Sequence, residues 1–512
     1  MKKEQLTKLC FVLVLFAAFL SVFIVSLVNE SNLCMGVKVV DKSFLENYSF
    51  GGRFDTREIL FNGKKVASDE KWERIYISQP ENALNNFSDL AGELRSEKYE
   101  LYFIKDQCLR DLKYAVKNSM YLSLAAVKDG EYRIIDVIIT TLPVISLDGR
   151  VAYKNEDGRN VSQGNMILFA GSDPKYKSLK ITESELEWNP RGGSSLGDIK
   201  KPYKLSLKNK GEIFDAELLG LGSDDDWILN PMNRDDTDLR EKFLMDFWNK
   251  YIVQSGNNFK MSQGEYVELV INGDYRGLYL LQRRIDRKYL ELNKETDILF
   301  KGKPVWEADT VSEAYEIIYS PFGEKETYDI AKTHLFSLSA KYYNTDAFID
   351  FSIFFNYGVI TDNSGFKNMY YVLKWNGEEY SVYFIPWDVD ISLGVTWKND
   401  NFAYDYEKSM SIHAGRSEYN KIKGLMEYNK QKYGTLSLDE SISKRWAELK
   451  ENTFTTENVY EILDKNKEVL EQSGAKIRDK KLFGLYYKGE DTIARLYDFA
   501  KLRIFKLDEF YK

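Results

Sequence analysis

Carboxylates and an amide gather in residues 361–394, whose sequence is TDNSGFKNMYYVLKWNGEEYSVYFIPWDVDISLG. Asp362 and Asn368 precede a largely apolar stretch, and Asp388 and Asp390 follow it. Carboxylate and amide oxygens are hard ligands that suit Mg²⁺, and a carboxylate can also accept the proton of a hydroxyl nucleophile. These residue types therefore predict metal-assisted transfer of a phosphoryl group.

The stretch between these polar residues has the pattern of a β-hairpin. Residues 369–375 and 379–385 are rich in Tyr, Val, Leu, Phe and Ile, and Asn376-Gly377 between them suits a two-residue type I′ turn. Such a turn places Asn368 opposite Ile385, and directly opposed residues lie roughly 5 Å apart. We therefore expect the four polar residues to emerge at one end of the hairpin.

The order of these parts is similar to that of protein kinases, in which a catalytic-loop Asp, a nearby Asn and a second Asp position the nucleophile and hold Mg²⁺. The letters differ, because Ile360-Thr361 stands where His-Arg precedes the kinase Asp, and residues 386–390 replace Asp-Phe-Gly. These differences exclude an ordinary protein kinase. The alternative is that the carboxylates cap turns or bind a structural cation.

Composition narrows the classes of protein that the chain can belong to. The 512 residues and 44% hydrophobic content support two or three domains with large cores. A formal net charge of -8 and the lack of a basic block argue against nucleic-acid binding. The two histidines, His334 and His413, lie near no matching Ser or Cys motif, which makes histidine-based triads and zinc sites improbable. The three cysteines form no disulfide framework.

Residues 9–28 carry no charge and are long enough, as a helix, to cross roughly 30 Å of hydrocarbon. Lys2, Lys3 and Lys8 precede them, which predicts a cytoplasmic tail over residues 1–8 and an extracytoplasmic chain after the span. We therefore expect a single-pass cell-membrane protein with a signal anchor. A cleavable signal peptide is the alternative, but its apolar region is usually shorter, and no A-x-A site follows here.

The rest of the chain divides near residue 140. Residues 34–140 alternate short apolar runs with polar turns, which predicts a small strand-rich module without recognisable chemistry. In residues 141–512, strands dominate to about residue 285 and helices follow from about residue 327. The expected class is α+β, with a strand-rich N-terminal part and a helical C-terminal part.

Basic residues that suit phosphate occur in the strand-rich part. Lys204 alternates with apolar residues on a predicted half-exposed strand, and the turn RGGSS begins at Arg191. The alternative for the lysine is a solvated side chain on an edge strand. Arg240 falls in the first turn of a predicted helix, where a cation opposes the helix dipole and so requires an anionic partner. A second hairpin, 267–271 against 275–281 around an Asn-Gly turn, ends in the exit Leu281-Gln282-Arg283. This exit is consistent with a place facing an adenine ring, and core packing explains its apolar residues equally well.

Several motifs, taken in order, resemble the spore coat protein H (CotH) kinase family from about residue 142 to 512. They are LPVISLDG, RGGSS with KKPYKLSL, LLGLGSDDDWILN with DLREKF, YVELVINGDYRGLYLL, and NMYYVLKWNGEEYSVYFIPWDVDISLG. The resemblance implies an atypical protein-kinase-like fold. It also implies phosphorylation of Ser or Thr by Mg-ATP, with Mn²⁺ as a possible alternative ion, on exported or coat proteins.

The resemblance further implies a role for individual residues. Asp362 matches the catalytic-loop carboxylate and Asn368 the amide beside it. Asp388 and Asp390 match the metal-binding carboxylates, with Asn368 as a further ligand.

The remaining matches concern the nucleotide. Lys201 or Lys204 resembles the phosphate-contacting lysine, and Arg191 and Arg240 match two family arginines. The family motif usually has RGN where this chain has RGG, and an acidic residue commonly stands at the position of Gln282.

The leading hypothesis is therefore a membrane-anchored extracytoplasmic protein kinase that uses ATP and Mg²⁺ and acts on protein substrates of the cell surface or spore coat. The alternative is a catalytically inactive kinase-like scaffold or binding protein. A third possibility is glycan cleavage by Asp362 and Asp388 as paired carboxylates, but the chain lacks an obvious motif for an aromatic-lined sugar cleft.

Overall fold

The structure is a computed structural model. It describes residues 32–511 except for 53, 172–179, 257, 306–307, 337–340, 361, 364–365, 396–422, 424–426, 428–429, 432–434 and 485–491. The predicted membrane span, residues 9–28, lies outside the described residues. Among the residues that are described, no helix has the length and apolar character needed to cross a bilayer.

The first part of the chain forms a mixed sheet with the order β1-β2-β9-β10-β11-β7-β6. Alternation along β10 and β11 directs Leu124, Ile135 and Val137 into a core that two short helices cover. The elements are β1 (Leu33–Cys34), β2 (Val37–Val40), β3 (Ser49–Phe50), β6 (Ala67–Asp69), β7 (Arg74–Ser78), β9 (Glu100–Ile104), α2 (Gln107–Arg110), α3 (Leu112–Lys117), β10 (Leu122–Lys128) and β11 (Glu131–Thr140). A small sheet of β4 (Ile59–Phe61), β5 (Lys64–Lys65) and β8 (Leu94–Ser96) lies beside it.

The second sheet has the order β14-β13-β12-β20-β21-β19-β15-β16, and an additional pairing of β14 with β15 closes it into a ring. Its interior is filled by large side chains such as Trp188, Trp227 and Tyr279. The strands are β12 (Val144–Lys154), β13 (Asn160–Ala170), β14 (Lys180–Pro190), β15 (Tyr203–Asn209), β16 (Glu212–Ile213), β19 (Asp226–Asn230), β20 (Gly264–Ile271) and β21 (Asp274–Arg283), with the small pair β17 (Ala216–Glu217) and β18 (Ser223–Asp224) beside them.

The second predicted hairpin is confirmed. Ile271 of β20 pairs with Asp274 of β21, so that Asn272 and Gly273 alone form the turn. Their φ angles of 52° and 72° are both positive, as a type I′ turn requires.

The third sheet has the order β23-β22-β24-β25, and helices surround it. Helix α8 is buried along almost its whole length, in agreement with its apolar sequence. The elements are α4 (Arg240–Phe247), α5 (Val253–Ser255), β22 (Ile298–Gly302), α6 (Val311–Ala314), β23 (Tyr315–Tyr319), α7 (Glu324–His334), α8 (Thr345–Gly358), β24 (Met369–Trp375), β25 (Tyr380–Pro386), α11 (Leu438–Asn452), α12 (Thr456–Ser473), α13 (Ala475–Phe483) and α14 (Ile493–Phe510).

The predicted register of the β24–β25 hairpin is wrong. Trp375 pairs with Tyr380, so the connection is longer than two residues, and Tyr370 takes the place opposite Ile385 that we expected for Asn368. The reason is that the Asn376 side chain accepts hydrogen bonds from the backbone N–H groups of Glu378 and Glu379, both at 2.9 Å, and so stabilises a wider loop. Because the shift is an even number of residues, each side chain keeps its face of the sheet.

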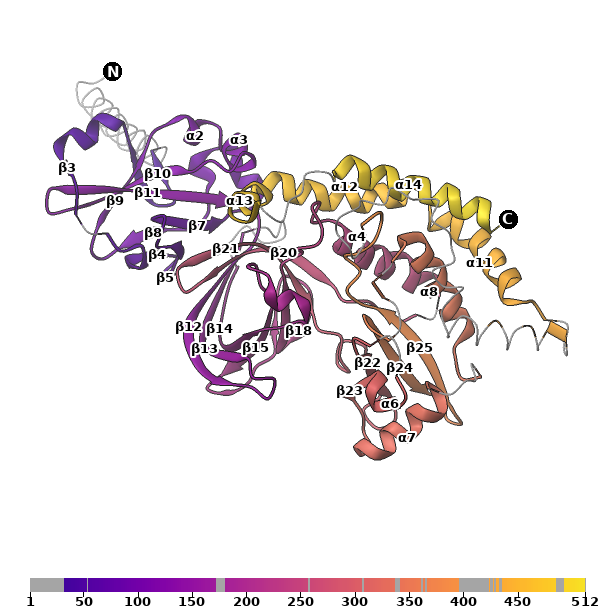
Figure 1. Cartoon of the computed structure of the whole chain (residues 1–512). Coiled ribbons are helices and arrows are strands. Elements are labelled where there is room, and N and C mark those ends of the chain that lie inside the picture. The colour runs from indigo at the N-terminus through magenta and orange to yellow at the C-terminus, as the bar shows by residue number, and fades with distance from the viewer. Residues whose placement is uncertain are drawn as a thin grey trace, which may run out of the picture.

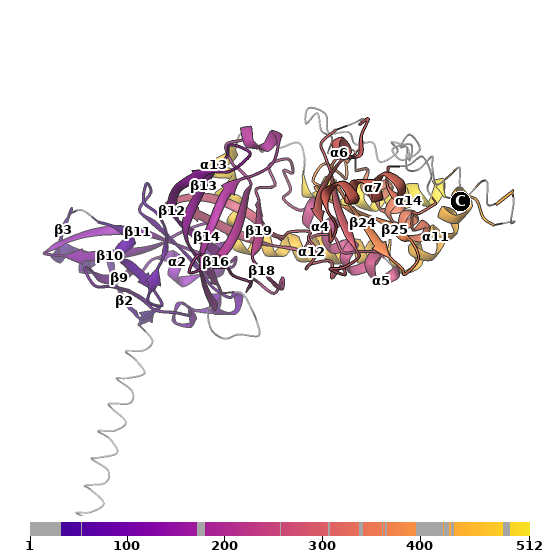
Figure 2. The same cartoon turned by 90° about the horizontal axis from the view of Figure 1, so that it is seen from below.

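The three sheets follow one another along the molecule (Figure 1), and Figure 2 shows the same order from below. The C-terminal helices run along one side and return toward the first part of the chain, where α12 contacts α3. Helix α13 contacts β21 of the closed sheet. The mixed α+β class is confirmed, with strands in the N-terminal part and helices at the C-terminus.

Candidate active site

A cleft with a volume of about 1030 Å³ lies between the closed sheet and the third sheet, since residues of both sheets line it. Among the predicted site residues, the structure brings six into its lining: Arg191, Lys204, Asp362, Asn368, Asp388 and Asp390. The other three, Lys201, Arg240 and Gln282, lie outside the lining. All four polar residues that we expected at one end of the hairpin, namely Asp362, Asn368, Asp388 and Asp390, therefore line one cleft.

Asp362 is held by two neighbours from its own loop. Lys367 Nζ lies 2.5 Å from Asp362 Oδ1, and Asn368 Nδ2 donates to Asp362 Oδ2 at 3.1 Å. The buried Asn363 side chain donates to the carbonyl oxygens of Asn368 and Trp387, both at 2.7 Å. These bonds tie the Asp362 loop to the end of the hairpin, which fixes the direction of the carboxylate.

Asp388 and Asp390 follow β25 in a loop without regular structure. Asp388 has a φ of 56°, a left-handed conformation that Asp and Asn adopt more readily than most residues. Burial raises the pKa of Asp388, although the charge of Arg191 lowers it in part. Burial and then the charge of Asp388 raise the pKa of Asp390 well above its usual range. The two carboxylates therefore repel each other in a partly buried place, and a cation between them would relieve that repulsion.

A further carboxylate of the cleft, Glu241, was not predicted. It lies in the first turn of α4 and accepts hydrogen bonds from Gln282 Nε2 at 2.8 Å and from Asn230 Nδ2 at 2.7 Å. Burial, followed by the charge of Asp388, raises the pKa of Glu241 to about 7. The available signal was an acidic residue in a predicted helix N-terminus, which the dipole favours. Gln282 thus positions an acid instead of facing an adenine ring.

Arg240, the residue before Glu241, is completely buried, and its contacts stabilise the fold. Its guanidinium pairs with Asp235 at 2.5 Å, which supplies the anionic partner expected for a cation in this position. It also donates to the carbonyl oxygens of Ser392 at 3.1 Å and Leu393 at 3.4 Å. Arg240 therefore joins α4 to the loop that carries Asp388 and Asp390.

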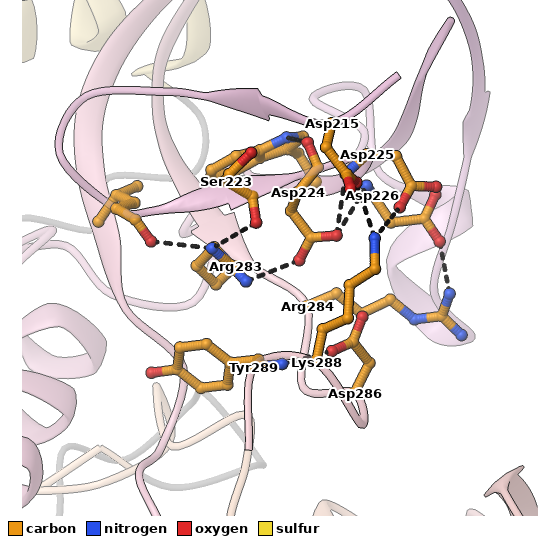
Figure 3. A network of polar contacts seen from close by, with 12 residues as sticks. Asp215, Ser223, Asp224, Asp225, Asp226, Arg283, Arg284, Asp286, Lys288 and Tyr289 are labelled. Carbon is orange, nitrogen blue, oxygen red and sulfur yellow. Dashed lines mark hydrogen bonds and ion pairs between the residues drawn. The ribbon is translucent and has the colours of Figure 1, made fainter. Parts of the chain in front are cut away.

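The two candidate lysines are both engaged with protein groups. Lys201 Nζ donates to the carbonyl oxygens of Leu196 at 2.5 Å and Asp198 at 3.2 Å, so it caps its own loop. Lys204 lines the cleft, but its Nζ lies 3.1 Å from Asp226 Oδ2. Asp226 also pairs with Arg284, a contact that Figure 3 shows.

A metal ion fits this donor set only in an open arrangement. In the described part of the chain, one group of three acidic side chains has carboxylate oxygens within 4.8 Å of one another, namely Asp215, Asp224 and Asp225, outside the cleft. The cleft carboxylates thus form no closed cage. Mg²⁺ usually takes one or two carboxylates, with water and substrate phosphates as the other ligands, and Asp388 and Asp390 suit that pattern.

Comparison with known protein families shows to which family the chain belongs. The model of the CotH kinase protein family matches residues 189–504. The chain belongs to the CotH kinase family. The match covers the closed-sheet strands from the end of β14 onward, the third sheet and nearly all of the C-terminal helices.

Membership of the CotH kinase family makes this a kinase-like protein and implies ATP and a divalent metal ion in general terms. The first sheet, residues 33–140, lies outside the family match. A search of curated proteins found no match to this sequence.

Proposed function

We propose that this chain is a membrane-anchored, extracytoplasmic protein kinase that transfers phosphate from Mg-ATP to Ser or Thr of exported or surface proteins. The observation that supports this most is the convergence of Asp362, Asn368, Asp388 and Asp390 in one cleft of a CotH-family chain. In this proposal the closed sheet and α4 correspond to the small lobe of a protein kinase, and the third sheet with its helices corresponds to the large lobe.

The acceptor hydroxyl is the nucleophile of the proposed reaction. Its oxygen forms a bond to the γ-phosphorus of ATP, while the bond from that phosphorus to the oxygen bridging the β-phosphate breaks. The hydroxyl proton passes to Asp362, whose carboxylate Lys367 and Asn368 hold in place at 2.5 and 3.1 Å. Asp362 contributes mainly orientation, because phosphoryl transfer depends on positioning and charge stabilisation more than on base strength.

Asp388 and Asp390, with Asn368 beside them, are the residues that would hold the divalent ion. When bound, such an ion neutralises the charge that develops on the phosphate oxygens. The raised pKa values of both aspartates support this role, because their burial together is unfavourable without a cation.

The membrane location rests on the sequence. Residues 9–28 are uncharged and follow three lysines, which favours a signal anchor with the remainder of the chain outside the cytoplasm. Protein acceptors would therefore be cell-surface, exported or spore-coat proteins.

The test is incorporation of radiolabel from [γ-³²P]ATP by the full-length protein in detergent, with Mg²⁺ or Mn²⁺ and with itself or a generic protein as acceptor. Asp388→Asn keeps the side-chain shape and tolerates the φ of 56° while removing the charge. Asp225→Asn, outside the cleft, is the matched control. Equal incorporation by wild type and Asp388→Asn would overturn the role of Asp388.

A second candidate is a nucleotide-binding or scaffold protein without catalysis. Gln282 favours this candidate, because the family commonly has an acid at this position. In the hydrogen-bonded pair of Gln282 and Glu241, Glu241 is therefore the one acid. Thermal unfolding with Mg-ATP separates binding from its absence, since a ligand at 100 times its Kd adds about 2.7 kcal/mol. A thermal shift without any label incorporation would favour this candidate.

A further inference from the structure

The cationic side chains that line the cleft differ in what they contact. Most of them have an acidic neighbour within 4.0 Å, and these pairs are Arg159–Asp157, Lys204–Asp226, Arg234–Asp198, Arg284–Asp226 and Lys367–Asp362. Arg191 and Lys301 also line the cleft, and within the described ranges neither has an ion pair. Acidic groups of the cleft act on both cations only from beyond ion-pair distance, so their N–H groups remain available to a ligand.

Arg191 and Lys301 come from different sheets but flank the same pair of aromatic rings. Arg191 directly follows β14, and its guanidinium lies 5.9 Å from the ring centroid of Trp387. Lys301 belongs to β22, and its Nζ lies 5.7 Å from the ring centroid of Tyr370. Tyr370 and Trp387 contact each other edge to face, with centroids 5.7 Å apart. The rings hold both cations by their faces, and such contacts leave the N–H groups free to donate.

The two cations act on each other. Burial lowers the pKa of Lys301, and the charge of Arg191 is the next largest cause. Two partly buried like charges are unfavourable unless an anion lies between them. The charges of Glu316, the cross-strand partner of Lys301, and then of Asp388 act in the opposite direction on the pKa of Lys301. The influence of Asp388 puts the pair of cations beside the candidate metal ligands.

We propose that Arg191 and Lys301 together bind the polyphosphate chain of the nucleotide, in place of Lys201 or Lys204. This inference rests on the proposed function, because it assigns the phosphate contacts of the same cleft. Lys201 donates its hydrogen bonds to carbonyl oxygens of its own loop, and Lys204 forms an ion pair with Asp226. Lys301 reaches the phosphates from the third sheet, whereas the typical kinase lysine reaches them from the small-lobe sheet.

Calorimetry on the full-length protein in detergent, with Mg²⁺, tests the assignment by comparing ATP with adenosine. For Lys301→Met and for Arg191→Gln we expect ATP affinity to fall about ten- to hundredfold, as loss of a charge-assisted hydrogen bond implies. Adenosine affinity should change less than about threefold, because that ligand has no phosphate. Lys301→Arg should restore much of the ATP affinity.

Lys374→Met is the matched control. Lys374 also lies over an aromatic ring, 5.4 Å from the centroid of Phe259, but it is exposed and does not line the cleft. We expect its ATP affinity to equal that of wild type. Inorganic tripolyphosphate should compete with ATP in the wild type and in this control, and much less in Lys301→Met.

Two results separate failure of this inference from failure of the proposed function. If the wild type binds ATP but Lys301→Met and Arg191→Gln bind it equally well, while Lys204→Met or Lys201→Met weakens binding, the assignment is wrong and the function stands. If the wild type binds no nucleotide, the proposed function fails as well. Should Lys301→Met not fold, Arg191→Gln carries the same expectation and decides the question.

Discussion

Two acidic clusters of this molecule contain similar side chains but compensate their charge differently. In the cluster of Figure 3, Asp224 pairs with Arg283, Asp226 with Arg284, and Asp215 and Asp225 with Lys288. In the cleft, Lys367 pairs with Asp362. No ion pair to Glu241, Asp388 or Asp390 occurs within the described residues, and the pKa of each is raised.

This difference in ion pairing indicates that the cluster of Figure 3 stabilises the fold, whereas the cluster of the cleft is suited to bind a cation. Paired acids need no external cation, and removing one partner leaves a buried charge behind. Unpaired buried acids cost stability and become favourable only when a cation arrives, which is typical of functional sites. The two clusters should therefore respond in opposite ways to substitution.

The largest effect is expected for Arg283→Met in the paired cluster. Arg283 and Asp224 are both buried and lie 2.9 Å apart, so the substitution leaves the Asp224 carboxyl without its cation. We expect the free energy of unfolding to fall by about 3 to 5 kcal/mol, measured by urea denaturation. The double variant Arg283→Met/Asp224→Asn should recover part of that loss. Full stability of Arg283→Met would contradict the view that this cluster is structural.

Asp388→Asn should show the reverse pattern. We expect kcat/KM for phosphorylation to fall at least about a hundredfold, because a metal ligand is lost. Without divalent ions, the free energy of unfolding should stay the same or rise, since a partly buried charge that neighbouring acids repel has been removed. Asp225→Asn is the counterpart in the paired cluster, and it should keep full activity. If Asp388→Asn lost stability but kept its activity, Asp388 would stabilise the fold, as the acids of the paired cluster do, and would not bind a metal ion.

The pH dependence of the free energy of unfolding tests the same difference between paired and unpaired acids, because Glu241 is an acid of the cleft without an ion pair in the described part of the chain. Its pKa is raised from 4.5 to about 7, so between these values the folded protein holds a proton that the unfolded chain has released. Stability should therefore fall by about 1 to 3 kcal/mol as the pH rises from 5 to 8 in the absence of divalent ions.

Glu241→Gln should flatten this slope in urea unfolding series. Glu461→Gln is the control, because Glu461 is exposed, pairs with Lys250 and does not line the cleft. An unchanged slope in Glu241→Gln would show that Asp388 or Asp390 carries the proton instead.

Local patterns predicted much of what positions these clusters. Alternating apolar residues and Asn-Gly pairs indicated both hairpins, and the expectation that Asp362 and Asp388 lie near each other follows from the hairpin of β24 and β25. The register near Asn376 was missed because a side chain-to-backbone bond decided the loop length.

Glu241 and Lys301 were missed for a different reason. Each belongs to an element whose position depends on packing between sheets that are distant in sequence. The helix N-terminus favoured an acid at Glu241, but the neighbouring residues did not place either side chain in the cleft. Pairing of cations such as Lys204 with Asp226 is equally non-local. Short-range sequence patterns can propose which residues do chemistry, but which charges stay unpaired is a property of the folded molecule.

The smallest effect is expected for Lys288→Met, at the exposed edge of the paired cluster. Lys288 bonds Asp215 at 2.7 Å and Asp225 at 3.3 Å, but its side chain is 43% exposed, so water screens both contacts. We expect the free energy of unfolding to fall by less than about 1 kcal/mol, measured in the same urea series as Arg283→Met. A loss as large as that of Arg283→Met would mean that the cluster depends on Lys288 as its internal cation. The buried pair Arg283–Asp224 and the exposed pairs of Lys288 would then contribute equally to stability, and burial would not explain how much an ion pair of this cluster contributes.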